Sequence, residues 1–144
     1  MMTTGVDSIN STVQQTHEWL MELCDMEGMV GEAQAYTALR AVLQTLRDRL
    51  TVDEAAHLAA QLPMLIRGVY YEGWKPARSP GRMRTRQEFF GAIADRLGNS
   101  ELDPVRACRS VFHLLERKIS PGEIRDVVRM LPEEVRELWT GQMT

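Results

Sequence analysis

The stretch ALRAVLQTLRDRLTVDEAAHLAAQLPMLIRGVYY, residues 38–71, occurs a second time in the chain in altered form. Residues 107–140, ACRSVFHLLERKISPGEIRDVVRMLPEEVRELWT, align with it at an offset of 69 positions and without a gap. Eight of the 34 aligned positions are identical, and the apolar positions fall in register. Self-similarity at a fixed offset is typical of a duplicated structural unit, so the stretch predicts a chain built from two related halves.

Both copies carry apolar residues at alternating spacings of three and four. Such spacing places these residues on one face of an amphipathic helix. The stripes are Tyr36, Leu39, Leu43, Leu46 and Leu50 in the first copy, and Val105, Cys108, Phe112, Leu115 and Ile119 in the second. No segment shows the alternation of period two that is typical of a strand, so the pattern predicts an all-α fold.

Helix starts are marked by a hydroxyl residue followed three positions later by glutamate, at Thr51–Glu54, Thr85–Glu88 and Ser120–Glu123. In such a capping box the hydroxyl accepts a hydrogen bond from the first helical turn, and the glutamate reaches back to the capping residue. Pro63 and Pro132 then end the third helix of each copy and can occupy the first turn of a fourth. We therefore expect Glu54 to be a capping side chain at an exposed helix start.

These signals together predict two tandem repeats of a four-helix unit packed as one compact helical domain, residues 1–144. The first repeat is expected at 8–74 and the second at 85–141. A basic segment containing proline and glycine, residues 75–84, joins them.

Composition places the chain among ordinary globular proteins, with 44% hydrophobic and 26% charged residues and a net charge of −3. Two cysteines, Cys24 and Cys108, lie in apolar patterns outside any CxxC motif, which favours a reducing compartment, and we expect a cytoplasmic protein. No run of about 18 apolar residues occurs, so we expect no membrane span. The first residues also lack the charged and apolar regions of a signal peptide.

Two stretches carry a family resemblance. AVLQTLRDRLTVDEAAHLAAQLPMLIRGVYYEGWKP (41–76), followed by RQEFF (86–90), resembles the bacterial family of domain of unknown function 2267. The resemblance extends from about Trp19 to Trp139. It implies an all-helical, duplicated bacterial domain. No activity comes with it, so no catalytic residue is carried over.

Motifs for catalysis or cofactor binding are missing from the sequence. There is no phosphate-binding loop, no GxSxG and no HExxH. His17, His57 and His113 are isolated. Asp53 and Glu54 place a carboxylate one turn from His57 and could in principle ligate a metal, although an exposed helix start with a capping glutamate explains the same spacing. We therefore predict no catalytic residue, no metal site and no cofactor.

The two copies differ on one face of their last helix. Met64, Leu65 and Gly68 of the first copy correspond to glutamates in the second. Either the second unit covers this face, or the face is an exposed interaction surface. We expect the covered arrangement, with Leu65 and Ile66 both buried and the helix after Pro63 the more central of the two equivalent helices.

A basic segment follows this helix. Residues 75–86 hold five basic residues and no acidic one. The segment could bind nucleic acid, lie as a strap on acidic helix surface, or be a solvated linker. The candidate interaction surface is Met64, Leu65, Gly68, Tyr71, Trp74, Lys75, Arg78, Arg82, Arg84 and Arg86.

For function, the sequence favours a non-catalytic module for protein interaction or regulation, which binds a partner protein or self-associates. One alternative is nucleic-acid binding through 75–86. Another is a small-molecule pocket between the repeats, near Tyr70, Tyr71 and Trp74. Nucleic-acid binding would fall steeply with salt, whereas an apolar interface would not.

Overall fold

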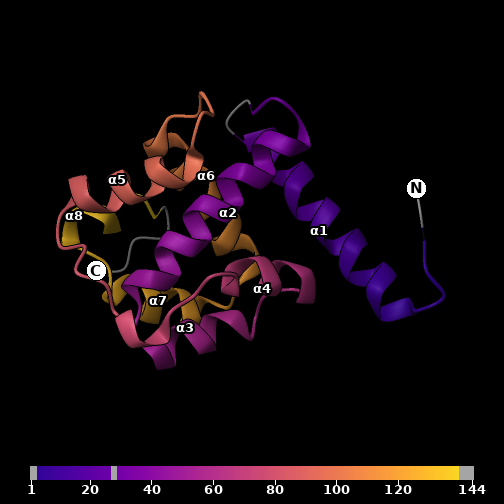
Figure 1. Ribbon diagram of the computed structural model, residues 1–144, viewed down its shortest axis with the longest axis horizontal. Helices are drawn as coiled ribbons and strands as arrows, with labels where there is room; N and C mark the ends of the chain where they lie inside the picture. Colours follow the sequence, from indigo (N-terminus) through magenta and orange to yellow (C-terminus); the bar gives the residue numbers. More distant parts are fainter. Residues whose placement is uncertain (1–2, 27–28, 140–144) are drawn as a thin grey trace.

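The computed structural model describes residues 3–26 and 29–139, and all regular structure in these residues is helical (Figure 1). The prediction of an all-α fold is therefore confirmed. The second repeat was expected to end at residue 141, which lies outside the described residues. The elements are α1 (Asp7–Met26), α2 (Gly31–Arg49), α3 (Val52–Ala59), α4 (Met64–Tyr71), the 3₁₀ turn η1 (Pro76–Arg78), α5 (Arg86–Leu97), α6 (Pro104–Lys118), α7 (Pro121–Arg129) and α8 (Glu133–Arg136).

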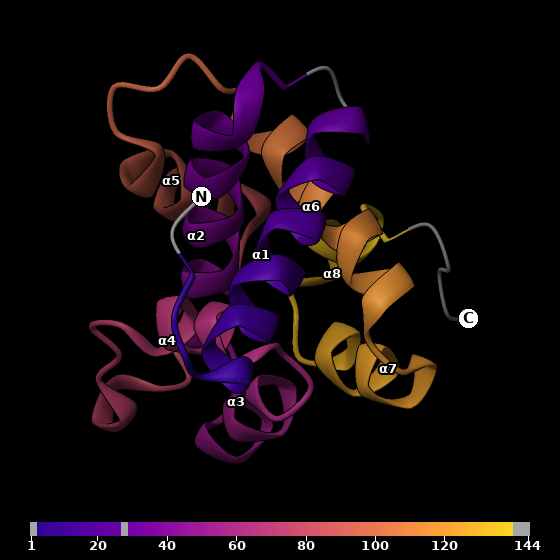
Figure 2. The same ribbon diagram turned by 90° about the vertical axis from the view of Figure 1, so that its right-hand side faces the viewer.

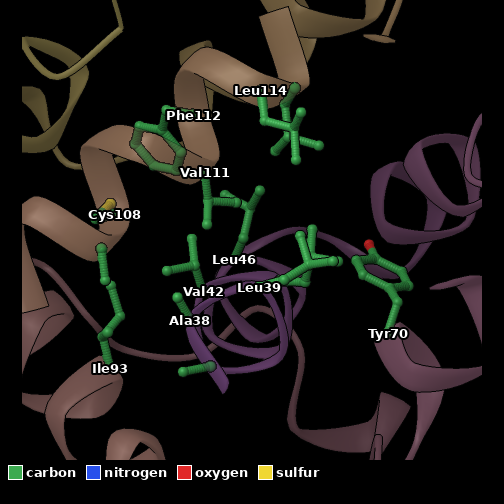
Figure 3. Packing of buried hydrophobic residues seen from close by; sticks show 14 of the residues in the cluster. Ala38, Leu39, Val42, Leu46, Tyr70, Ile93, Cys108, Val111, Phe112 and Leu114 are labelled. Atoms are coloured by element: carbon green, nitrogen blue, oxygen red, sulfur yellow. The ribbon is translucent and has the colours of Figure 1, made fainter. Parts of the chain in front are cut away.

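Helix α2 is the centre of the packing and contacts α1, α4, α5 and α6. Its sequence explains this position, because a helix that is apolar on several faces is stable only when neighbours surround it. Figure 3 shows Leu39, Val42 and Leu46 of α2 facing α6, with the side chain of Ile93 on one side of them and that of Tyr70 on the other. The stripe residues expected to be buried in α2 and α6 are buried, with Tyr36 and Val105 as exceptions at the N-terminal ends.

The helix starts follow the predicted caps in part. The side chains of Thr51, Thr85 and Ser120 each accept a hydrogen bond from the backbone N–H three residues on. The reciprocal bond, which the Thr85 backbone N–H donates to the Glu88 carboxylate, is present at the start of α5. The side chain of Glu54 is buried instead of exposed, so the expectation of a capping glutamate at an exposed helix start is wrong. Its carboxylate points toward α7, where the tertiary contact takes the place of the local one.

Helices α3 and α7 lie side by side and connect the first part of the chain to the last (Figure 2). Gln61, just after α3, donates from Nε2 to Ser120 Oγ at 3.0 Å and accepts from the Ser120 backbone N–H at 2.9 Å. On the other side of the contact, the Thr51 hydroxyl lies 3.8 Å from Met130 Sδ. Each capping hydroxyl thus also contacts the end of the opposite helix.

On helix α4, one of the two residues predicted to be buried is exposed. Ile66 is buried as expected, but Leu65 is 43% exposed, so its predicted burial is wrong. The reason is that α4 packs on α1, α2 and α3 through Ile66 and Tyr70, and no described element covers its opposite face.

The basic segment is held against the end of α2. The Gly81 N–H donates to the Asp48 carbonyl at 2.6 Å, and Arg49 Nε donates to the Met83 carbonyl at 2.9 Å. Trp74 Nε1 donates to Ser79 Oγ at 2.9 Å and closes the loop on itself. These bonds are those of a strap rather than of a freely solvated linker.

Within residues 3–26 and 29–139, no helix combines the length and the apolar character needed to cross a membrane.

Candidate functional site

Exposed apolar side chains from two elements gather at one side of the molecule. We call them the α1–α4 surface: Val6, Ile9 and Val13 at the start of the chain, and Met64 and Leu65 at the start of α4. Each of the five is between 39% and 51% exposed. The Leu65 N–H donates to Thr12 Oγ1 at 2.9 Å, which places Leu65 against the turn of α1 that carries Ile9 and Val13. Side chains distant in sequence therefore share one surface.

The first half of α1 packs on very little. Between Asp7 and Glu18 the only buried side chain is Thr12, whereas the second half buries Trp19, Leu20 and Leu23. Figure 1 shows the first half of α1 reaching away from the other helices. A helix end without tertiary packing has little stability of its own in water. Its apolar side chains are therefore available to a partner.

The candidate residues after α4 lie in a different environment. Tyr71 and Trp74 are half-buried and stack on each other, with ring centroids 5.4 Å apart. Gly68 is exposed. Tyr70 is fully buried, and its hydroxyl donates to the Ala55 carbonyl at 2.8 Å. Met64, Leu65 and Gly68 of α4 are thus all exposed, whereas Tyr71 and Trp74 pack on each other beside the strap.

The basic residues of the candidate surface fall into two groups, four that are exposed and one that is half-buried. Lys75, Arg78, Arg82 and Arg84 are exposed. Arg86 is half-buried, with its guanidinium carbon 4.9 Å from the centroid of the Phe90 ring. Arg86 is therefore partly engaged in packing, while the other four side chains face solvent.

A pocket of about 360 Å³ lies beside the strap. Its inner wall holds Asp48, which is paired with Arg47 at 2.8 Å and with Arg96 at 2.6 Å. Arg47 is 3% exposed and also donates to the carbonyls of Tyr70 and Glu72. Lys75 and Arg78 line the outer wall, and within the described part of the chain neither forms an ion pair. Four cations around one carboxylate leave the pocket positive.

A second cluster lies at the contact of α3 and α7. Glu54 and Glu123 occupy the first turns of the two helices and are 6% and 8% exposed. The Oε2 atom of each is buried, and no N–H or O–H group of another described residue donates a hydrogen bond to it. His57, one turn after Glu54 and exposed, has Nδ1 3.9 Å from Glu54 Oε1. One donor atom from each of the three side chains lies within 4.8 Å of the others.

The environment of Glu123 changes its acidity. The pKa of Glu123 is raised to about 8, mainly by burial, then by the hydrogen bond that its protonated form makes with Glu54, and by the negative charges of Glu54 and Asp126. Two carboxylates in contact cannot both carry an unbalanced charge away from water. This pair therefore requires a proton or a cation.

Sequence reasoning missed this cluster because it assigned Glu54 and Glu123 to local caps. A signal was present, since both glutamates occupy equivalent positions of the repeated stretch and His57 follows one of them at helical spacing. The cysteines, by contrast, show no sign of reactivity. Burial raises the pKa of both thiols, and Cys108 is fully buried among apolar side chains.

The model of a family described as an uncharacterized conserved protein (DUF2267) matches residues 16–138. No curated protein matches the chain. The matched residues include α2 to α8, the glutamate cluster and the exposed face of α4, but not Val6, Ile9 and Val13. Because the match spans most of the sequence, the chain belongs to the DUF2267 family.

Proposed function

We propose that this protein is a non-catalytic protein-interaction module and that the α1–α4 surface is its contact site. The observation that carries the proposal is the exposure of five large apolar side chains beside a helix end that packs on almost nothing. Single exposed apolar residues are common on proteins, whereas a contiguous group on a projecting element is typical of an interface.

The occupant we propose is a second copy of the chain. Two copies related by a twofold axis can each lay the first half of α1 over the exposed face of the other's α4, so that the same residues serve both subunits. Charge does not oppose this contact, because Asp7 and Glu18 are the charged residues of the first half of α1 and lie at its two ends. The contact would cover Ile9, Val13 and Leu65 together.

The test is the mass of the purified protein in solution, measured by light scattering and by sedimentation over a range of concentrations. We expect the wild type to form dimers, and Leu65→Glu and Ile9→Glu to remain monomeric. Met21→Glu is the matched control, because Met21 is also 43% exposed and lies on the second half of α1. A wild type that stays monomeric at every concentration would contradict the proposed self-association.

A second candidate function is supported by the basic pocket. Lys75 and Arg78 lie at its rim and form no ion pair with any residue that the structure describes, and the exposed Arg82 and Arg84 extend the positive surface along the strap. This arrangement suits phosphate groups, including those of a nucleic acid. Binding of a labelled single-stranded oligonucleotide should weaken steeply as salt rises.

The control for this candidate is a basic residue elsewhere. Lys75→Ala and Arg78→Ala should each weaken oligonucleotide binding and reduce its salt dependence, whereas Arg125→Ala, on the exposed face of α7, should not. If all three substitutions weaken oligonucleotide binding equally, binding depends on the net charge of the protein and not on the basic pocket.

The two-repeat arrangement is also part of this proposal. The helices of the two halves follow one another in the same order. In the aligned repeats Thr51 corresponds to Ser120, and Gln61 to Met130. The contact of Thr51 with Met130 and the contact of Ser120 with Gln61 are therefore the same contact made in both directions. Arg67 donates to carbonyls at the end of α3, and its counterpart Arg136 donates to carbonyls at the end of α7. An experimental structure in which α6–α8 does not superpose on α2–α4 would contradict the duplication.

A further inference from the structure

We propose that Glu54, His57 and Glu123 form a binding site for a divalent transition-metal ion, which would bridge α3 and α7. These three side chains lie apart from the α1–α4 surface and bring their donor atoms together. Two of the carboxylate oxygens are buried and receive no hydrogen bond from any other described residue.

The geometry suits a small ion. Zinc binds nitrogen and oxygen donors at about 2.0–2.2 Å in a tetrahedral arrangement, which separates neighbouring donors by roughly 3.4 Å. The three donor atoms here lie within 4.8 Å of one another. His57 is exposed, so its ring can rotate toward the two carboxylates.

The unpaired oxygens are the second observation. Glu54 Oε2 and Glu123 Oε2 are buried, and among the described residues no other side chain or backbone group donates a hydrogen bond to either atom. The nearby Tyr70 hydroxyl is already committed to the Ala55 carbonyl. Within residues 3–26 and 29–139, neither glutamate forms an ion pair with lysine or arginine, and Arg129 pairs instead with Asp126. Buried carboxylates without a partner are costly, and a shared cation would relieve both.

The donor set indicates the class of metal. Imidazole together with carboxylates suits zinc and its transition-metal neighbours, whereas magnesium and calcium prefer oxygen ligands alone. Glu54 and His57 are three positions apart on one helix, a spacing that places two ligands on the same face. Glu123 then supplies a ligand from the other helix, so the ion would link two segments distant in sequence.

The experiment uses the full chain after treatment with a chelator, titrated with zinc chloride by calorimetry. The melting temperature is followed in parallel. We expect one zinc ion per chain and a higher melting temperature with zinc than without, and no response to magnesium. Glu123→Gln keeps the shape of the side chain but removes the charge, and it should abolish both effects.

Two histidine variants complete the test. His57→Ala removes an exposed side chain and leaves the core packing unchanged. Loss of a residue that only supports a metal ligand typically weakens binding by roughly 10–100-fold. Because His57 would bind the ion directly, its loss should weaken zinc binding by more than that. His17→Ala, which removes an exposed histidine paired with Glu32, should bind zinc as the wild type does. Absence of zinc binding in the wild type, as expected if the pair holds only a shared proton, would overturn the proposal. Binding that survives both Glu123→Gln and His57→Ala would overturn it equally.

Discussion

The carboxylates of Glu54 and Glu123 face each other across the contact between α3 and α7, although the residues lie 69 positions apart in the sequence. Each occupies the third position of its helix, after the capping hydroxyls of Thr51 and Ser120. The two helix starts therefore bring like charges together inside the protein. A contact of this kind is stable only when a proton or a cation neutralises it.

The metal-free protein should lose stability as pH rises. The pKa of Glu123 is raised in the folded state from its ordinary value of 4.5 to about 8, by burial first and then by Glu54 and Asp126. The folded state thus holds a proton that the unfolded state releases, so the stabilising contribution is complete below pH 4.5 and is lost as pH rises through 8. Urea unfolding in the presence of a chelator, between pH 5 and 9, measures the effect.

Glu123→Gln supplies the comparison for this pH dependence. The amide resembles the protonated carboxyl group and can donate a hydrogen bond to Glu54 at every pH. The variant should therefore match or exceed the stability of the wild type at pH 9 and show a flatter profile. Identical slopes for the two proteins would show that Glu123 titrates normally.

Adjacent residues of α4 should respond in opposite ways to the same substitution. Leu65→Glu places a charge on a side chain that is 43% exposed, so the free energy of unfolding of the monomer should change by less than about 0.5 kcal/mol. Ile66→Glu buries an unpaired charge at a position 1% exposed and should cost several kcal/mol, roughly half or more of a typical stability of 5–15 kcal/mol. Urea unfolding at low protein concentration gives both values. Unfolding of Leu65→Glu would show that the residue is part of the core after all.

The strap depends on close contact at Gly81. A Cβ atom at this position would lie 3.1 Å from the Asp48 carbonyl oxygen, which is backbone and cannot turn away. Gly81→Ala should therefore loosen residues 75–84 and speed trypsin cleavage at Arg82 and Arg84. Gly91→Ala is the control, since its Cβ meets nothing within 4 Å and should stabilise α5 by about 1 kcal/mol without affecting cleavage. Equal cleavage rates in both variants would contradict the role of this contact.

The sequence was sufficient for features that depend on local pattern. The stripes of α2 and α6 and the hydroxyl caps before α3, α5 and α7 follow from helical spacing and from side chains that bond within one turn. These interactions are decided by neighbours in the chain, and sequence alone therefore identifies them.

The sequence alone did not predict the features that depend on packing between distant segments. The spacing of Thr51 and Glu54 fits a capping box in either of two orientations of the carboxylate, back to the helix start or inward to α7. Which orientation the carboxylate takes depends on how closely α7 packs on α3. The polarity difference between Leu65 and Glu134 likewise identified an unusual face. Whether another element covers that face depends on how α1 docks, which helical periodicity does not specify.

The most direct test of the interaction surface is hydrogen exchange of the α1 amides, measured at a series of protein concentrations. The first half of α1 packs on little in the single chain, so its amides should exchange rapidly in dilute solution, and faster than those near Leu23. If a second copy covers Ile9 and Val13, exchange in residues 9–16 should slow as the wild-type concentration rises, and it should stay fast at all concentrations in Leu65→Glu. Exchange in these residues that does not change with wild-type concentration would contradict the account.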